Sequence, residues 1–362
     1  MKILILSSVD YGLNGISIVI ERLYANKIFS NEDVTFVFPN TSEIGMIDVL
    51  NSYGYKVNIM NRNSNPMKYF FNLLRFMKQN NFDIVHVHGN SATNTIEVLA
   101  AKIVAIPIRI MHVHSASCKH ININRVLKPT LNYLCTHRFA CSQQAAEYLF
   151  DDRKCHIIKN GLDVKKYGFD ISERNNLRAE YKVNDNLVIG HVGGFSDVKN
   201  QRFLVDLFYS YHSEHPASKL VLVGDGGCRK EIQNKVEKLS ISQDVLFLGN
   251  RNDVYSLLNM IDLFVFPSIH EGFGVAPIEA QINGLPVIAS EGVPRSIKIN
   301  DNVYFLSLDD DISVWVKQIE NISLVRESNS VEKVLNAGFD ISDISQNILM
   351  LYQELKGETA CK

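Results

Sequence analysis

Short apolar runs rich in β-branched residues alternate with helical stretches along nearly the whole chain. This alternation predicts right-handed βαβ units, and hence parallel sheets with helices on both faces. The expected strands are 2–7, 34–38, 56–59, 84–87, 108–113, 138–141 and 156–158, then 187–191, 219–223, 245–248, 263–266, 287–289 and 303–306.

The strand pattern stops and restarts once, which indicates two domains. Residues 160–186 are polar and only weakly periodic, and we interpret them as a linker. A length of 362 residues also fits two domains. We therefore expect an α/β fold of two Rossmann-like, doubly wound parallel-sheet domains facing a central cleft, with a boundary between 163 and 164. Ligands of such sheets bind beyond the carboxyl ends of the strands.

Charge is unevenly distributed between the two halves. Residues 1–160 contain 17 Lys and Arg against 11 Asp and Glu, a net charge of +6, whereas residues 161–362 contain 20 against 28, a net charge of −8. No acidic residue occurs between Val98 and Glu147. A basic half favours an anionic partner such as a membrane surface or a lipid diphosphate. A solvated basic face would give the same pattern, so both interpretations stay open.

Composition argues against several classes of protein. No run of 18 apolar residues occurs, so no membrane span is expected. The first apolar run is too short for a signal peptide and is typical of a first strand. The six cysteines show no metal-binding spacing, which favours reduced thiols in a cytoplasmic protein. We expect no nucleic-acid partner.

Two helical stretches of the first half are expected between the strands. Residues 68–78 are amphipathic and basic, and we expect most of their apolar face to cover the sheet, with the basic face available to a membrane. A further helix is expected at 129–137. In the second half, the three aspartates 309–311 could suggest a metal, but they precede a predicted helix, where acids stabilise the N-terminus. We expect no metal there.

One segment of the second half is suited to an anionic ligand that also carries hydroxyls. Glu271 and Glu279 flank Gly272, Gly274 and Pro277. The glycines and the proline prevent one continuous helix, so the chain bends and both carboxylates can face one ligand. Pro277 suits the first position of a helix, whose N-terminus attracts phosphate. The alternative is a plain strand–loop–helix turn with acids placed against the helix dipole.

Five segments occur in a distinctive order from the linker through most of the second half. They are Ile158-Lys159-Asn160-Gly161-Leu162-Asp163, then His191-Val192-Gly193-Gly194-Phe195 with Lys199-Asn200, Leu222-Val223-Gly224-Asp225-Gly226, Phe247-Leu248-Gly249, and the Glu271/Glu279 pair as E-x7-E. This order resembles glycosyltransferase family 4. In the first half, residues 112–116 and 139–142 resemble the bacterial capsule, exopolysaccharide and O-antigen enzymes of that family.

The resemblance implies the GT-B fold, with an acceptor domain at 1–163 and a donor domain at 164–340. It also implies that a C-terminal helix within 341–362, roughly 341–355, crosses back onto the N-terminal domain. The implied activity is transfer of a hexose, with retention of configuration, from a nucleotide sugar, a UDP-sugar above all. A lipid-linked saccharide is the implied acceptor, and no metal or other cofactor is expected.

The resemblance also assigns roles in donor binding. Lys199 should contact the diphosphate, as a flexible point charge can. Glu279 should accept hydrogen bonds from the ribose hydroxyls. Glu271 should hold the transferred hexose and the phosphates together with three backbone groups, those of Gly272, Phe273 and Gly274.

Glycines and one arginine complete the expected donor site. Gly193 belongs to the strand end that precedes Lys199. Gly15, in the loop 11–15 after the first strand, should bring backbone N–H groups to the diphosphate from the other domain, although a plain strand-to-helix turn explains that loop equally well. The family usually has Arg where this chain has Gly194. Either another basic residue, such as Arg251, replaces that guanidinium or donor binding is weaker.

The catalytic group is expected among strand-end histidines of the first half. His114 is our choice, and His112 is also plausible because residues two apart share one face of a strand. His86 and His88 end another strand, and we interpret them as structural. No carboxylate nucleophile is evident, so the resemblance implies a front-face mechanism in which the donor phosphate helps to deprotonate the acceptor.

Three alternatives were compared with transfer. A nucleotide-sugar 2-epimerase-like enzyme would share the fold. A non-catalytic nucleotide-sugar-binding protein is conceivable because Gly194 replaces Arg. A dinucleotide-dependent oxidoreductase would need G-x-G-x-x-G after the first strand, and residues 7–15 do not supply it.

Overall fold

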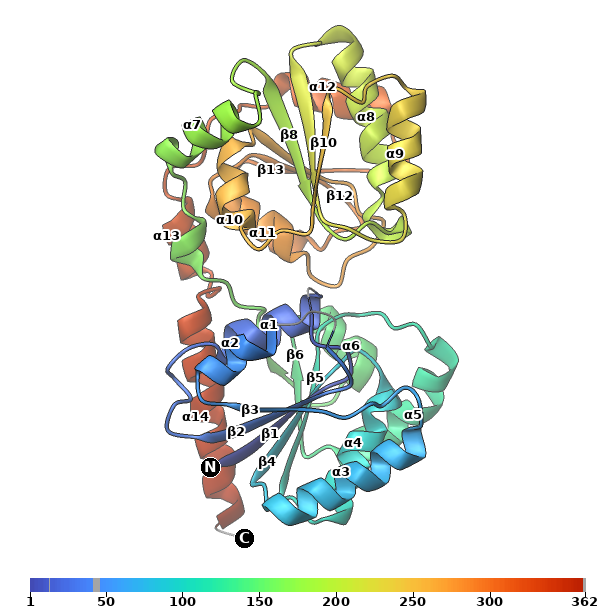
Figure 1. The fold of residues 1–362 in the computed structure, drawn as a ribbon, viewed down its shortest axis with the longest axis vertical. Coiled ribbons are helices and arrows are strands. Elements are labelled where there is room, and N and C mark those ends of the chain that lie inside the picture. The colour runs from blue at the N-terminus through green and yellow to red at the C-terminus, as the bar shows by residue number, and fades with distance from the viewer. Residues whose placement is uncertain (13, 42–45, 361–362) are drawn as a thin grey trace. The chain divides into compact units, whose positions relative to one another are not determined.

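The chain forms two compact units in a computed structural model that describes residues 1–12, 14–41 and 46–360. Unit 1 comprises Met1–Leu162 and Gly338–Lys362, and unit 2 comprises Asp163–Ala337. Each unit is a parallel sheet flanked by helices (Figure 1). The prediction of two doubly wound parallel-sheet domains is confirmed.

The sheet of unit 1 has seven parallel strands in the order β3-β2-β1-β4-β5-β6-β7. The strand order reverses between β1 and β4, the place where ligands bind in open α/β sheets. The strands are β1 Lys2–Ser7, β2 Asp33–Phe38, β3 Lys56–Ile59, β4 Ile84–His88, β5 Ile108–Val113, β6 His137–Ala140 and β7 His156–Ile157.

The main helices of unit 1 are α1 Gly15–Tyr24, α2 Met46–Ser52, α3 Pro66–Asn80, α4 Thr95–Ile103, α5 Ile121–Leu134, α6 Gln143–Phe150 and α14 Ile341–Ala360. Helix α3 buries Tyr69, Leu73 and Met77 at four-residue spacing, as predicted for most of its apolar face. The C-terminal helix α14 is longer than predicted. It places Ile348 and Tyr352 in the core of unit 1.

The sheet of unit 2 has six parallel strands in the order β10-β9-β8-β11-β12-β13. The strands are β8 Leu187–Val192, β9 Ser218–Val223, β10 Val245–Gly249, β11 Leu263–Phe266, β12 Val287–Ser290 and β13 Val303–Leu306. The helices are α7 Ile171–Glu180, α8 Gln201–Glu214, α9 Arg229–Lys238, α10 Val254–Leu257, α11 Val275–Ile282, α12 Ile312–Asn321 and α13 Ser330–Asn336.

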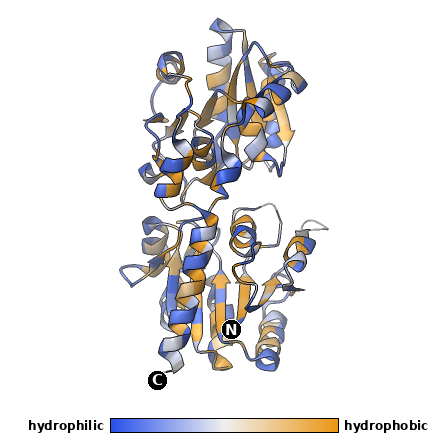
Figure 2. Ribbon diagram, turned by 90° about the vertical axis from the view of Figure 1, so that its left-hand side faces the viewer, coloured by the Kyte–Doolittle hydropathy of each residue, from blue (hydrophilic) through white to orange (hydrophobic). Residues whose placement is uncertain are grey.

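Apolar residues are frequent in the strands, whereas the helices alternate between polar and apolar residues (Figure 2). The core of unit 2 includes Trp315, the single tryptophan of the chain, which is fully buried. Within the described part of the chain, no helix combines the length and the apolar character that crossing a bilayer requires.

The predictions for two segments were partly wrong. The expected linker 160–186 contains helix α7, which Asp170 caps by accepting from the N–H of Ser172 at 2.8 Å. The helix expected at 129–137 is instead α5, which begins at Ile121 and contains Pro129. Proline removes one internal hydrogen bond, but it does not have to end a helix whose other face is packed.

One of the three aspartates 309–311 lies at the start of a helix, as predicted. Asp311 precedes α12 and accepts from the N–H of Ser313 at 2.9 Å. Hydrogen bonds from the side chain of Ser313 and from its N–H lower the pKa of the Asp311 carboxyl below its usual range. The carboxylate therefore caps the helix.

Candidate active site

Glycine-rich turns form the carboxyl edge of the sheet in unit 2. Gly193 follows β8, and residues 224–226 follow β9. Gly224 has a φ of +130°, and a Cβ there would lie 2.2 Å from the carbonyl oxygen of Gly193. Only glycine can bring the two turns so close together. The N–H of Phe195 donates to the carbonyl of Asp225 at 2.9 Å and joins the turns.

Lys199 and Glu271 meet at this edge, although they lie far apart in the sequence. The Nζ of Lys199 is 2.6 Å from the Oε1 of Glu271, and it lies 4.7 Å from the ring centroid of Phe266. The two side chains are 24% and 12% exposed, so the pair is sheltered but accessible. An ammonium group has three donors, so Lys199 can bind an oxyanion and keep its contact with Glu271.

Two backbone contacts fix the loop that carries Glu271. The N–H of Ile269 donates to the carbonyl of Val198 at 2.8 Å, and the N–H of Glu271 donates to the carbonyl of Gly292 at 3.1 Å. A Cβ at Gly292 would lie 2.1 Å from the carbonyl oxygen of Ile269. The ends of β8, β11 and β12 therefore hold Glu271 against Lys199.

Glu279 lies in helix α11 and is 7% exposed. Tyr167 donates its hydroxyl hydrogen bond to the Oε1 of Glu279 at 2.9 Å. The prediction that Pro277 begins the helix was wrong. Gly274 adopts a left-handed conformation and caps α11, which begins at Val275. Proline is tolerated at the third position because the first four N–H groups of a helix have no partner within it.

The other predicted glycines of the donor domain differ in the space around them. A Cβ on Gly193 would lie 3.2 Å from the Nε2 of His191, a buried imidazole whose pKa burial lowers to about 4. A Cβ on Gly194 would come no closer than 3.5 Å to its neighbours, the nearest being the carbonyl oxygen of Asp225. Gly194 therefore has room for a side chain, whereas Gly193 has almost none.

Arg251 lies in the loop after β10, and its guanidinium is paired with a neighbouring carboxylate. Its guanidinium donates two hydrogen bonds to the carboxylate of Asp253, at 2.7 and 2.6 Å. A contact with a donor phosphate stays a prediction for this residue.

Gly15 is the first residue of α1 in unit 1. Asn14 caps that helix by accepting from the N–H of Ser17 at 3.0 Å. Among the residues that the structure describes, a Cβ on Gly15 would meet nothing within 4 Å. Leu13, in the same predicted loop, lies outside the described residues.

Four histidines form a buried stack at the carboxyl ends of β4 and β5. They are His86, His88, His112 and His114, and their neighbouring rings have centroids 4.1 to 5.2 Å apart. Both strands end in the pattern His-Val-His, and His88 lies directly opposite His112 in the parallel register. Side chains two apart on adjacent strands share one face of a sheet, so the four imidazoles gather on one face.

Hydrogen bonds cross the stack from one strand to the other. The Nδ1 of His88 is 2.9 Å from the Nε2 of His114, and the Nε2 of His86 is 3.2 Å from the Nδ1 of His112. His86 also contacts the hydroxyl of Tyr352 on α14. The sequence interpretation of His86 and His88 as structural agrees with these contacts, but their pairing with His112 and His114 was not predicted. The repeated His-Val-His pattern was the available signal.

His114 has partners at both ring nitrogens. Its Nδ1 lies 3.3 Å from the Oδ1 of Asn160 and donates to it, so its Nε2 accepts from the Nδ1–H of His88. Burial lowers the pKa of His114 to about 4. The imidazole is therefore neutral near pH 7, and the long contact to Asn160 is the one that a ligand can most readily exchange.

The ring nitrogens of His86, His88 and His112 lie within 4.8 Å of one another, a spacing that a metal site could use. However, two of these ring nitrogens are already paired with each other, since the Nε2 of His86 lies 3.2 Å from the Nδ1 of His112, and the Nδ1 of His86 contacts the hydroxyl of Tyr352. The arrangement suits hydrogen bonding between neighbouring imidazoles.

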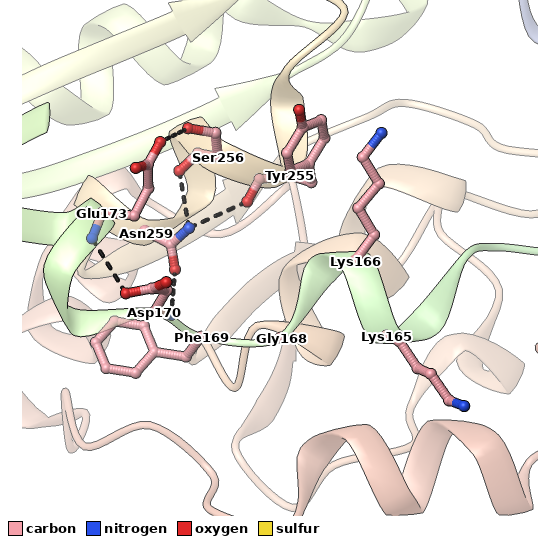
Figure 3. Close-up of a pocket in the computed structure, with 9 residues that line it drawn as sticks. All are labelled: Lys165, Lys166, Gly168, Phe169, Asp170, Glu173, Tyr255, Ser256 and Asn259. Carbon is pink, nitrogen blue, oxygen red and sulfur yellow. Dashed lines mark hydrogen bonds between the residues drawn. The ribbon is translucent and has the colours of Figure 1, made fainter.

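Unit 2 also contains a separate hollow of about 480 Å³ beside the segment that carries Tyr167 (Figure 3). Lys166 lies 4.1 Å from the ring centroid of Tyr255 there. Asn259 accepts from the N–H of Asp170 and donates to the carbonyls of Tyr255 and Ser256. These polar lining groups are thus already paired with one another.

Comparison with known proteins agrees with this geometry. Residues 14–166 match the family model described as Glycosyltransferase Family 4, and residues 173–330 match that described as Glycosyl transferases group 1. The chain is 32% identical to EpsF of Bacillus subtilis (strain 168), a protein named as a glycosyltransferase, over 71% of this chain and 70% of the relative.

Two further comparisons extend over more of the chain. A UDP-Gal:alpha-D-GlcNAc-diphosphoundecaprenol alpha-1,3-galactosyltransferase of Escherichia coli is 28% identical over 80% of each chain. The crystal structure of Anabaena HepE in complex with UDP is 19% identical, with a TM-score of 0.79, and covers 98% of this chain and 100% of that one. The similarity to the HepE structure shows that the two proteins share a fold.

The chain has two Rossmann-like units, and a lysine and a glutamate meet beside glycine turns at the edge of the second. This fold and this site define a GT-B-type glycosyltransferase. The chain belongs to glycosyltransferase family 4.

Proposed function

We propose that this protein transfers a hexose from a UDP-sugar to a hydroxyl of a lipid-linked oligosaccharide, with retention of anomeric configuration, in surface polysaccharide biosynthesis. The observation that carries the proposal is the Lys199–Glu271 pair, held at 2.6 Å beside the glycine turns of unit 2. A cation, backbone N–H groups and a carboxylate are the groups that a diphosphate and sugar hydroxyls require together.

These contacts support the donor-binding roles that we propose. Lys199 binds the diphosphate and stays oriented by Glu271, whose second oxygen accepts a hydroxyl of the hexose. Glu279 accepts from the ribose, and Tyr167 holds its carboxylate in place. The backbone of residues 272–274 completes the site at the start of α11, where the helix dipole favours negative charge.

The acceptor and the cellular site are inferred from relatives and from charge. The name of the Escherichia coli relative specifies UDP-Gal and a diphosphoundecaprenol-linked sugar. From such a substrate we infer an enzyme that works in the cytoplasm at the inner face of the membrane, and the net charge of +6 over residues 1–160 suits an anionic surface.

In the proposed chemistry, the leaving phosphate deprotonates the acceptor hydroxyl on the same face of the sugar. His114 contributes as a neutral hydrogen-bond donor, because its pKa of about 4 excludes an imidazolium near pH 7. It exchanges Asn160 for a sugar hydroxyl. Lys199 balances the charge on the leaving diphosphate, so the proposal needs no metal.

Thermal shifts with UDP, GDP and ADP, each with and without EDTA, test the donor site. A ligand at 100 times its dissociation constant stabilises a protein by about 2.7 kcal/mol, which raises the melting temperature by several degrees. UDP should shift the wild type equally with and without EDTA. Glu279→Gln should abolish the shift, and Glu332→Gln, an exposed site on α13, should retain it. A wild type that no nucleotide stabilises would contradict the proposal.

Turnover separates transfer from its alternatives. With a UDP-hexose and an undecaprenyl-diphosphate-linked sugar, we expect UDP release and a product whose anomeric configuration matches the donor by NMR. Incubation with UDP-GlcNAc alone would yield a new nucleotide sugar only for a 2-epimerase-like enzyme. UDP binding without turnover over a panel of acceptors would instead indicate a binding protein.

A further inference from the structure

Helix α5 presents large apolar side chains to solvent. Ile123, Val126 and Tyr133 recur at helical spacing and are 50%, 75% and 76% exposed. Helices of globular proteins usually bury such a stripe and expose polar residues. An apolar stripe left outside, with polar residues around it, indicates an interaction surface.

Hydrogen bonds on the opposite face fix this orientation. Asn124 is buried, accepts from the N–H of Ala92 at 2.6 Å and donates to the hydroxyl of Tyr148 at 3.2 Å. Asn132 is also buried and donates to the carbonyl of Leu149 at 3.0 Å. Rotating α5 to bury Val126 would break these contacts and leave buried amides without partners, which is costly. The outward apolar stripe is therefore specified by the fold.

The surroundings of the stripe are basic. Lys102 on α4 places its Nζ 4.3 Å from the ring centroid of Tyr133. Arg125 on α5 and Lys119 just before it are exposed, while Lys128 pairs with Asp151 at 2.7 Å. No acidic residue occurs between Val98 and Glu147. A second copy of the same face would therefore meet repulsion between like charges.

Two neighbouring helices also expose apolar and basic side chains. Helix α3 packs on α4, and α4 packs on α5 (Figure 1). Helix α3 exposes Met67 and Phe71, at 66% and 59%, together with Lys68 and Arg75, and Ile103 at the end of α4 is 58% exposed. Apolar side chains interspersed with Lys and Arg match an anionic bilayer surface, where the apolar groups enter the interface and the cations meet headgroups.

We propose that α5 is the membrane-docking helix of this protein and inserts Ile123, Val126 and Tyr133 into an anionic lipid surface. This deepens the proposed function, on which it rests only for the lipid-linked nature of the acceptor. Docking through α5 would hold unit 1 at the bilayer surface from which such an acceptor projects.

Flotation with vesicles tests the docking. The wild type should float with vesicles that contain 30% phosphatidylglycerol in phosphatidylcholine, and at least tenfold less with phosphatidylcholine alone. Val126→Asp combined with Tyr133→Asp should reduce binding to the anionic vesicles at least tenfold. Val325→Asp is the matched control, since Val325 in unit 2 is 76% exposed, and it should bind as the wild type does. Circular dichroism verifies that each variant is folded.

Three outcomes would overturn the docking role: a wild type that does not float, equal binding by the Val126/Tyr133 variant, or a dimer in gel filtration that this variant dissociates without any vesicle binding. Transfer to a water-soluble acceptor separates the two proposals. The Val126/Tyr133 variant should keep that activity. If the wild type transfers sugar but does not float, α5 is not a docking helix and the proposed function stands. If it floats through α5 but transfers nothing, the docking surface stands and the proposed function fails.

Discussion

Units 1 and 2 share the same order for their first six strands, yet they differ in what lies at the carboxyl ends. In unit 1, β4 and β5 end in stacked imidazoles that bond to one another. In unit 2, β8 and β9 end in glycines, and a lysine and a carboxylate meet beside them. The same scaffold therefore supports a buried neutral network in one unit and an accessible charged edge in the other.

The difference arises from the residues at the carboxyl end of each strand. His88 is the last residue of β4 and His114 directly follows β5, so both side chains are held on the sheet face, where burial keeps them neutral. Glycines after β8 and β9 have no side chains to bury, and the chain turns sharply, which opens the edge to the side chain of Lys199. The residues at the ends of the strands, and not the order of the strands in the sheet, decide which edge carries accessible charged groups.

Unit 1 should unfold at a higher pH than unit 2 when the protein is acidified. Four buried histidines of unit 1 and one of unit 2, His191, have pKa values lowered by burial. A lowered histidine pKa stabilises the fold above pH 6.5, and that stability is lost as the pH falls towards the folded pKa. Each such histidine contributes about 1.4 kcal/mol per pH unit. Below pH 6.5, unit 1 should therefore lose stability more steeply than unit 2, and the half-buried His137 of unit 1, whose pKa burial also lowers, adds to the difference.

Two optical signals distinguish the units in this acid titration. Trp315 reports on unit 2 alone, whereas far-ultraviolet circular dichroism reports on both. Between pH 6.5 and 4.5 the circular dichroism should change before the emission of Trp315 shifts. At pH 7.5, where these histidines are neutral in both states, urea unfolding supplies the control. Emission that shifts first in acid would contradict the prediction.

Replacing Lys199 should damage the charged edge without unfolding it. Lys199→Ala removes a charge-assisted contact to phosphate, worth about 1.5 to 3 kcal/mol, so kcat/KM for the UDP-sugar should fall about 10- to 100-fold. Lys317→Ala, at an exposed position of α12, is the control and should leave the rate unchanged. A Lys199→Ala enzyme within twofold of the wild type would remove Lys199 from the donor site.

Restoring an arginine should strengthen the same edge. The Cβ of Gly194→Arg would lie 3.5 Å from its nearest neighbour, so the backbone can accept the side chain. A new guanidinium next to the diphosphate should tighten UDP binding about tenfold, or about 1.4 kcal/mol, as measured by titration calorimetry. Gly194→Ala should bind UDP as the wild type does. Weaker binding by Gly194→Arg would show that the phosphates lie elsewhere.

Much of the fold and part of the candidate site could be predicted from the sequence. Most strands bury a short apolar run, and the strands of the two sheets were all predicted to within one or two residues. Glycines also mark close turns locally, which identified the 191–200 and 271–279 segments. The helix bounds were less secure, because Pro129 lies inside α5 and α11 begins at Val275, two residues before Pro277.

The sequence by itself determined the strand pattern, the glycine turns and the candidate charges, because these depend on local propensity and on short-range backbone geometry. Only the tertiary structure decided which residues meet. Tyr167 reaches Glu279 across 112 positions, and His88 reaches His114 across 26. Likewise, α5 exposes Val126 because Asn124 and Asn132 bond to other segments. Such contacts depend on long-range packing, which no local pattern encodes.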